Sequence, residues 1–164
     1  MGESEKGEQV YRLLLEQASN ESDREVSYHQ LGLIKYEQGE YQEAIRFYEQ
    51  AIAITKGMKN SNLPSLTDSY SAIGTMYKKI GEDSKALSFY EKALDIDQRT
   101  LPPNHLDLAT SYNSISEIYD MMGEYSKALS YLQKALGILE KALPSTHPNI
   151  AECKEGIQLV KEKL

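Results

Sequence analysis

The alternation of apolar and polar residues has the period of an α-helix along most of the chain. In the clearest stretch, Ile73, Met76, Tyr77 and Ile80 recur at helical spacing, which predicts a helix over residues 65–80 with one apolar stripe. A second helix is predicted over residues 83–100. Its inward side alternates small and large residues: Ala86, Phe89, Tyr90, Ala93, Leu94 and Ile96. Because such alternation lets two helices interlock, the pattern predicts an all-α fold built from helix pairs.

Three glycines repeat this pattern along the chain. Gly39, Gly81 and Gly123 are spaced 42 residues apart, and each is followed by a similar helix with two alanines seven residues apart. Each glycine falls at the end of the preceding helix, where a left-handed backbone is needed that glycine adopts at little cost. A repeat of this length predicts an α-solenoid, in which each unit buries its apolar face against its neighbours.

The links between repeats and the two ends of the chain follow the same register. Residues 101–107 align with residues 143–149, and each link contains proline, which ends one helix and can open the next. Asn104, with Asp107 three residues later, is a predicted helix start. Gly2 matches the turn glycines, so we expect the chain to open on a second helix with an inner face of Val10, Tyr11, Leu14 and Leu15. We therefore expect a single domain over 1–164 with about eight helices: a lone second helix at 1–20, repeats at 21–60, 61–102 and 103–144, and a terminal capping helix at 145–164.

Composition narrows the choice of partner. The formal net charge of −7 disfavours nucleic acid and anionic lipid as main partners, because both require a basic surface. No stretch approaches the length of about 18 apolar residues that a membrane-spanning helix needs. Cys153 is the only cysteine, so an intrachain disulfide cannot form and a cytoplasmic location is favoured.

The residues that commonly carry chemistry do not form a catalytic or metal-binding pattern. His105 and His147 occupy equivalent links one repeat apart, so we expect them to cap helices rather than to share a metal ion. Cys153 has no histidine at helical spacing, which disfavours a nucleophilic role. The glycines are isolated turn residues and form no phosphate-binding loop. We expect no catalytic residue, no cofactor and no metal, and therefore no enzyme.

These repeats resemble the tetratricopeptide repeat family. The resemblance rests on recurring large, leucine-like, small, glycine, aromatic and alanine positions, which the second repeat supplies as Tyr70, Ile73, Gly74, Tyr77, Gly81, Ala86, Tyr90 and Ala93. The 42-residue period and the Leu-Pro-x-x-His links are similar to kinesin light chains, whereas the ordinary period of the family is about 34 residues. The resemblance implies antiparallel helix pairs stacked in a right-handed superhelix that acts as a scaffold for protein binding.

The sequence departs from this pattern at three informative positions. Lys35 stands where Tyr77 and Tyr119 stand, and Ser116 stands where Gly32 and Gly74 stand, although serine is still small enough for close packing. Gly7 replaces an alanine in the first helix of the chain. Glycine inside a helix costs about 0.5–1 kcal/mol relative to alanine, so we expect this helix to be the least stable one.

The resemblance also implies a concave groove lined by the first helices of successive repeats. Its predicted lining is apolar and aromatic in the first repeat, cationic in the second and acidic in the third: Val26, His29, Leu33, Tyr36, Ser71, Thr75, Lys78, Lys79, Asn113, Glu117 and Asp120. A peptide with an apolar anchor and a basic segment would match this gradient. The Lys, Arg and Asn clamp of the members that bind chaperone tails is absent. The alternative is that these positions are solvated polar faces without a ligand.

Two other interpretations remain open at this stage. The chain could self-associate head to tail, through Val10, Tyr11, Leu14 and Leu15 at one end and Ile150, Ile157 and Val160 at the other. Against this, the charged residues between 154 and 163 suit the solvated outer face of a capping helix, and a monomer is favoured. The chain could also be the non-catalytic part of a larger enzyme or of an adaptor similar to kinesin light chains.

Overall fold

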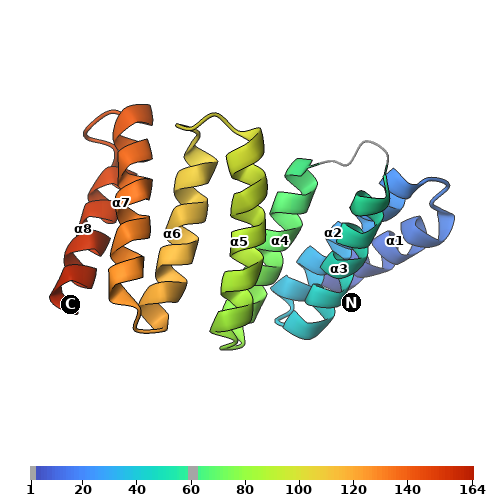
Figure 1. The fold of residues 1–164 in the computed structure, drawn as a ribbon. Helices are drawn as coiled ribbons and strands as arrows, with labels where there is room; N and C mark the ends of the chain where they lie inside the picture. Colours follow the sequence, from blue (N-terminus) through green and yellow to red (C-terminus); the bar gives the residue numbers. More distant parts are fainter. Residues whose placement is uncertain (1–2, 59–62) are drawn as a thin grey trace. The chain divides into compact units, whose positions relative to one another are not determined.

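The computed structural model describes residues 3–58 and 63–164. Within those residues the secondary structure consists of eight α-helices, which fall into two compact units, residues 1–82 and 83–164. Unit 1 contains α1 (Glu3–Gln17), α2 (Glu21–Glu37), α3 (Tyr41–Gly57) and α4 (Leu63–Lys79). Unit 2 contains α5 (Asp83–Thr100), α6 (Leu106–Met121), α7 (Tyr125–Ala142) and α8 (Pro148–Glu162). In each unit, helices that follow one another along the chain pack against each other (Figure 1).

The glycine turns have the backbone that the sequence predicts. Gly39, Gly81 and Gly123 have φ values of 77°, 78° and 76°, and they are the positive-φ residues among those described. The amide N–H of Glu40, just after the first of these glycines, donates to the carbonyl of Lys35 at 2.9 Å and so closes the end of α2. Gly2, which we expected to form a further turn of this kind, lies outside the described residues.

The N-cap residue of the helix after each of the two aligned Pro-containing links is histidine and not asparagine. His105 and His147 are the N-cap residues of α6 and α8, and their Nδ1 atoms accept from the amide N–H groups of Asp107 and Asn149, each at 3.3 Å. The capping role predicted for both histidines is therefore confirmed. The helix start predicted at Asn104 is wrong by one residue, because the His105 side chain reaches the free amide two residues later.

Close packing between paired helices depends on small residues at one position. A Cβ atom added to Gly32 of α2 would lie 2.7 Å from Cε2 of Tyr48, which is 3% exposed on α3. The equivalent residue in unit 2 is Ser116, which is buried and donates to the carbonyl of Ala128 at 3.0 Å. Serine is thus small enough here, as predicted, and its hydroxyl finds a partner across the helix pair.

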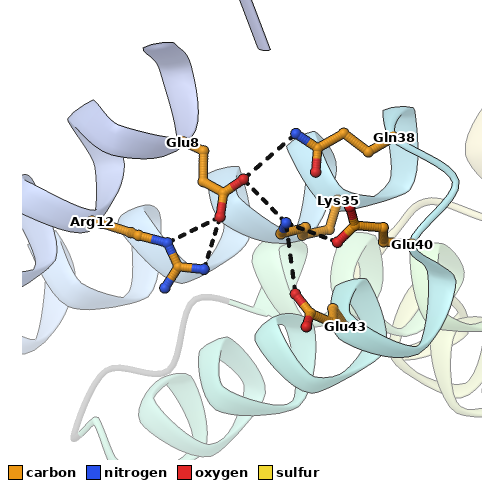
Figure 2. A network of polar contacts seen from close by, with 6 residues as sticks. All are labelled: Glu8, Arg12, Lys35, Gln38, Glu40 and Glu43. Carbon is orange, nitrogen blue, oxygen red and sulfur yellow. Dashed lines mark hydrogen bonds and ion pairs between the residues drawn. The ribbon is translucent and has the colours of Figure 1, made fainter. Parts of the chain in front are cut away.

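A network of charged side chains connects helix α1 to the other helices of unit 1 (Figure 2). The Lys35 ammonium lies 3.1 Å from a carboxylate oxygen of Glu8 on α1, 2.8 Å from Glu40 and 3.6 Å from Glu43. The same Glu8 carboxylate accepts from Nη2 of Arg12 at 2.8 Å. Lys35 therefore differs from its tyrosine counterparts because its ammonium pairs with an acidic residue of the neighbouring helix.

The electrostatics of this network follow from these contacts. Hydrogen bonds from Arg12, followed by those from Lys35, hold the pKa of Glu8 below its usual value of 4.5. The hydrogen bond to Glu40, together with that to Glu8, raises the pKa of Lys35 above its usual value of 10.5, against the opposing effect of burial. Both shifts favour the charged forms, so the network is strongest between the two pKa values.

The two ends of the chain differ from the sequence expectation. Val10 and Leu14 of α1 are 51% and 47% exposed, because they lie on the side of the helix that α2 does not cover, whereas Tyr11 is half-buried. Their assignment to an inner face is therefore wrong. At the other end, the predicted apolar stripe of α8 consists of Ile150, Ile157 and Val160. These side chains are buried in unit 2, where α8 packs on α7, so the stripe offers no exposed face for self-association.

Candidate functional site

Unit 2 contains a pocket of about 580 Å³ bounded by its last three helices. Helices α6 and α8 form its two sides, and side chains of α7 contribute to its lining. The lining residues are Leu106, Ala109, Thr110, Asn113 and Glu117 of α6, Leu132 and Leu139 of α7, and Asn149, Glu152 and Cys153 of α8.

The chemistry of this pocket is partly apolar and partly acidic. Leucines, including Leu132 and Leu139, supply apolar surface, while exposed Asn113 offers both an amide donor and an amide acceptor. The carboxylates of Glu117 and Glu152, one from each side of the pocket, add negative charge. Such a surface can cover an apolar side chain, hydrogen-bond to an extended backbone and attract a cationic group.

Cys153 lines the pocket, although its side chain does not suit nucleophilic chemistry. The thiol is 5% exposed and donates to the carbonyl of Leu132 at 3.5 Å. Burial, with a smaller contribution from the charge of Glu140, raises the pKa of Cys153, which favours the unreactive thiol. Cys153 was not among the predicted groove residues, and the repeat register gives no signal for it, because the aligned serines at positions 27, 69 and 111 line neither pocket.

Unit 1 contains a smaller pocket, of about 270 Å³, between α2 and α4. Its lining residues are Glu25, Val26, His29 and Gln30 of α2 and Pro64, Ser65 and Asp68 of α4. Glu25 is only 7% exposed, and its carboxylate accepts a short hydrogen bond from the Ser65 hydroxyl. The His29 ring packs edge-on against Tyr48, with 5.0 Å between ring centroids, which fixes one wall of the pocket.

The two pockets occupy the same place in the repeat. Their lining residues correspond after a shift of two 42-residue periods: Glu25 with Ala109, Val26 with Thr110, His29 with Asn113, Ser65 with Asn149 and Asp68 with Glu152. Each pocket thus lies between successive first helices of its own unit. This repetition shows that the pockets are a property of the repeat architecture and that their side chains give each one its own character.

The structure brings some of the predicted groove residues into these pockets. Val26 and His29 line the unit 1 pocket, and Asn113 and Glu117 line the unit 2 pocket. Asp120 lies further along α6, where both of its carboxylate oxygens accept from Lys163 at 2.7 Å. Glu25, which also lines the unit 1 pocket, was not predicted from the sequence, because its hydrogen-bond partner Ser65 lies on another helix.

The other predicted residues of unit 1 lie along α2 and α4 outside the pocket described above. Leu33 is 39% exposed, and Tyr36 is half-buried with its ring 5.8 Å from that of Tyr41. The Thr75 hydroxyl donates to the carbonyl of Ser71 at 3.0 Å, so its polar group is turned toward its own helix. Toward the end of α4, Lys78 is half-buried, and Lys79 is exposed.

Two other features bear on the function of the chain, namely metal-binding clusters and membrane-spanning helices. Among residues 3–58 and 63–164, no group of three or more His, Cys, Asp or Glu side chains is arranged to hold a metal ion. Over the same residues, no helix has the length and apolar character needed to cross a membrane.

Comparison with known proteins agrees with the repeat pattern. The sequence profile of the tetratricopeptide repeat matches residues 1–57 and 65–141. No curated protein matches the chain. Among solved structures, a kinesin light chain-like protein of Podosopora anserina with nearly identical repeats is 25% identical, with a TM-score of 0.82 over 98% of this chain and 76% of that one.

Two further structures share the fold at lower identity. The apo form of RapI has a TM-score of 0.84 at 20% identity, over 98% of this chain and 58% of that one. BtubC (BKLC) of P. vanneervenii has a TM-score of 0.75 at 18% identity, over 98% of this chain and 68% of that one. The sequence profile covers most of the chain, and the helices and glycine turns have the expected form. The chain therefore belongs to the tetratricopeptide repeat family, with repeats like those of kinesin light chains.

Proposed function

We propose that this protein is a non-catalytic interaction module that binds an extended segment of a partner protein in the unit 2 pocket, between the first helices α6 and α8. Tetratricopeptide repeats are a type of protein-interaction scaffold, and proteins similar to this one are typically non-catalytic. The observation that carries the proposal is the pocket of about 580 Å³ between α6 and α8. The cytoplasmic location expected from the sequence stays a prediction.

The lining of the unit 2 pocket supports a ligand of mixed character. Apolar surface from Leu132 and Leu139 can bury an apolar side chain, at about 25 cal/mol for each Å² removed from water. Asn113 can hydrogen-bond to the backbone of an extended segment, which lets the site bind many sequences through main-chain contacts. The acidic residues Glu117 and Glu152 favour a nearby basic residue, so we expect the ligand to combine an apolar anchor with positive charge.

Selection from a random peptide library tests this function directly. We expect peptides that bind the wild-type protein to lose about tenfold in affinity for the variants Asn113→Ala and Glu152→Gln, because each loss of about 1.4 kcal/mol is one decade. Gln133→Ala and Glu91→Gln are matched controls, since both residues are exposed on second helices and neither lines the pocket. Equal affinities of the pocket variants and the controls would show that the segment binds elsewhere.

A head-to-tail assembly is a second candidate, but the structure offers little for it. The buried stripe of α8 is not available, so the exposed apolar side chains of α1 would have to contact another surface: Val10, Leu13 and Leu14. Light scattering over a concentration series tests this alternative, and a constant monomer mass would exclude it.

A further inference from the structure

The unit 1 pocket contains a carboxylate on a buried residue, and no cation among residues 3–58 and 63–164 pairs with it. Glu25 is 7% exposed, and its hydrogen-bond partner is the neutral hydroxyl of Ser65. Among residues 3–58 and 63–164, no lysine, arginine or histidine forms an ion pair with Glu25. One hydroxyl satisfies only part of a carboxylate, which has about four acceptor positions. The second carboxylate oxygen is not among the fully buried side-chain atoms that lack a hydrogen-bond partner, so it is open to a donor in the pocket.

The rest of the pocket has the composition of a site for a cationic side chain. Asp68 supplies a second carboxylate from the opposite helix, and Gln30 supplies an amide oxygen. Val26 and Pro64 add apolar surface, against which the methylene groups of a long basic side chain can pack. A metal ion is a poorer occupant, since the described residues contain no group of three metal-ligating side chains.

We propose that the unit 1 pocket binds a lysine or arginine side chain of a partner protein, with Glu25 as the carboxylate that selects it. This inference deepens the proposed function, on which it rests, because it adds a contact in unit 1 that requires a cationic residue of the partner protein. The equivalent position in the unit 2 pocket is Ala109, so the buried carboxylate distinguishes the two pockets. The shared first-helix architecture therefore gives a specific cation site in unit 1 and a broader pocket in unit 2.

A small probe tests the site without knowledge of the partner. N-acetyl-arginine amide carries one positive charge, and N-acetyl-citrulline amide has nearly the same shape without the charge. In a titration followed by protein amide NMR, we expect the arginine probe to shift resonances of α2 and α4 around the pocket, and the citrulline probe to shift them much less. Equal responses to the two probes would overturn the proposal.

Two variants of the carboxylate and its partner separate binding from structure. Glu25→Gln keeps an oxygen that can accept from Ser65 but removes the charge. We therefore expect it to lower the affinity for the arginine probe about tenfold, the equivalent of about 1.4 kcal/mol. Ser65→Ala removes the hydroxyl and leaves the carboxylate free to pair, so we expect binding to be unchanged or tighter. If Glu25 only supported the structure through this hydrogen bond, both variants would have the same effect, and that result would contradict the proposal.

A matched control and the selected peptides complete the test. Glu37→Gln makes the same charge change on an exposed residue of α2 outside the pocket, and we expect it to leave the affinity of the arginine probe unchanged. An equal loss with Glu37→Gln would attribute the effect to net charge and overturn the proposal. If the arginine probe shifts no resonances around the unit 1 pocket while selected peptides still lose affinity with Asn113→Ala, this inference would be overturned and the proposed function would stand.

Discussion

The ion network around Lys35 predicts how firmly α1 is attached to unit 1. The Lys35 side chain is 8% exposed, and it connects Glu8 of α1 to Glu40 and Glu43. The variant Lys35→Met keeps the apolar stem but removes the ammonium. Loss of one partner from a fully buried ion pair costs about 3–5 kcal/mol, whereas exposed pairs contribute about 0–1 kcal/mol.

The surroundings of the remaining acids place this variant between those limits. Glu40 and Glu43 are 48% and 50% exposed and can return to solvent, and Glu8 keeps its bonds to Arg12. We therefore expect a loss of about 1–2 kcal/mol in the free energy that holds α1 in place, which corresponds to a factor of about 5–30 in the opening equilibrium.

Hydrogen–deuterium exchange resolves this loss helix by helix. In Lys35→Met we expect amides of α1 to exchange about 5–30 times faster, while amides of α6 and α7 are unchanged. The control Arg99→Met removes an exposed pair with Asp95 of the same helix, which should cost no more than about 0.5 kcal/mol. Unchanged exchange of α1 in Lys35→Met would refute the claim that this network holds the helix.

Four further predictions concern single residues, three of them in unit 1 and one in unit 2. Because the pKa of Glu8 is lowered in the folded protein, its contribution to stability is present above its usual value of 4.5 and is lost as pH falls through the lower folded value. Chemical denaturation at a series of acidic pH values should therefore show that the free energy of unfolding falls less on acidification in Glu8→Gln than in wild type. Gly32→Ala should destabilise the protein by about 1–3 kcal/mol, because its Cβ would meet the Tyr48 ring at 2.7 Å. Gly137→Ala, where a Cβ meets nothing within 4 Å, should instead stabilise it by about 0.5–1 kcal/mol, and chemical denaturation at neutral pH measures the change in both glycine variants. Burial, and after it the charge of Asp68, raises the pKa of Tyr48 to about 12. In a pH titration followed by tyrosinate absorbance, we therefore expect a step at high pH that is missing in Tyr48→Phe.

Local features of the fold could be predicted from the sequence because they depend on residues close together in the chain. The glycine turns depend on the backbone freedom of single residues such as Gly81. The second helix expected at 83–100 has those bounds in the structure, and the histidine caps follow from the repeated links. The first helix expected at 65–80 is displaced by only one or two residues and runs from Leu63 to Lys79.

Features that depend on neighbouring helices were harder to predict. A lysine at an aromatic position looked like a departure, since its partner Glu8 lies far away in sequence on α1. Val10 and Leu14 have the apolar character of inner positions, but the pattern alone does not show which side of α1 a neighbour covers. Glu25 resembles any acidic residue of a helix until α4 brings Ser65 against it.

The location of a bound peptide on the protein tests the proposed binding site most directly. A peptide selected by the wild-type protein, carrying a photoreactive group beside its apolar anchor, can be cross-linked and the attached residues identified by mass spectrometry. If the unit 2 pocket binds the peptide, the cross-links should fall on its lining, within residues 106–117 of α6 and 149–153 of α8. Cross-links confined to the second helices α5 and α7, away from Leu132 and Leu139, would contradict the proposed site.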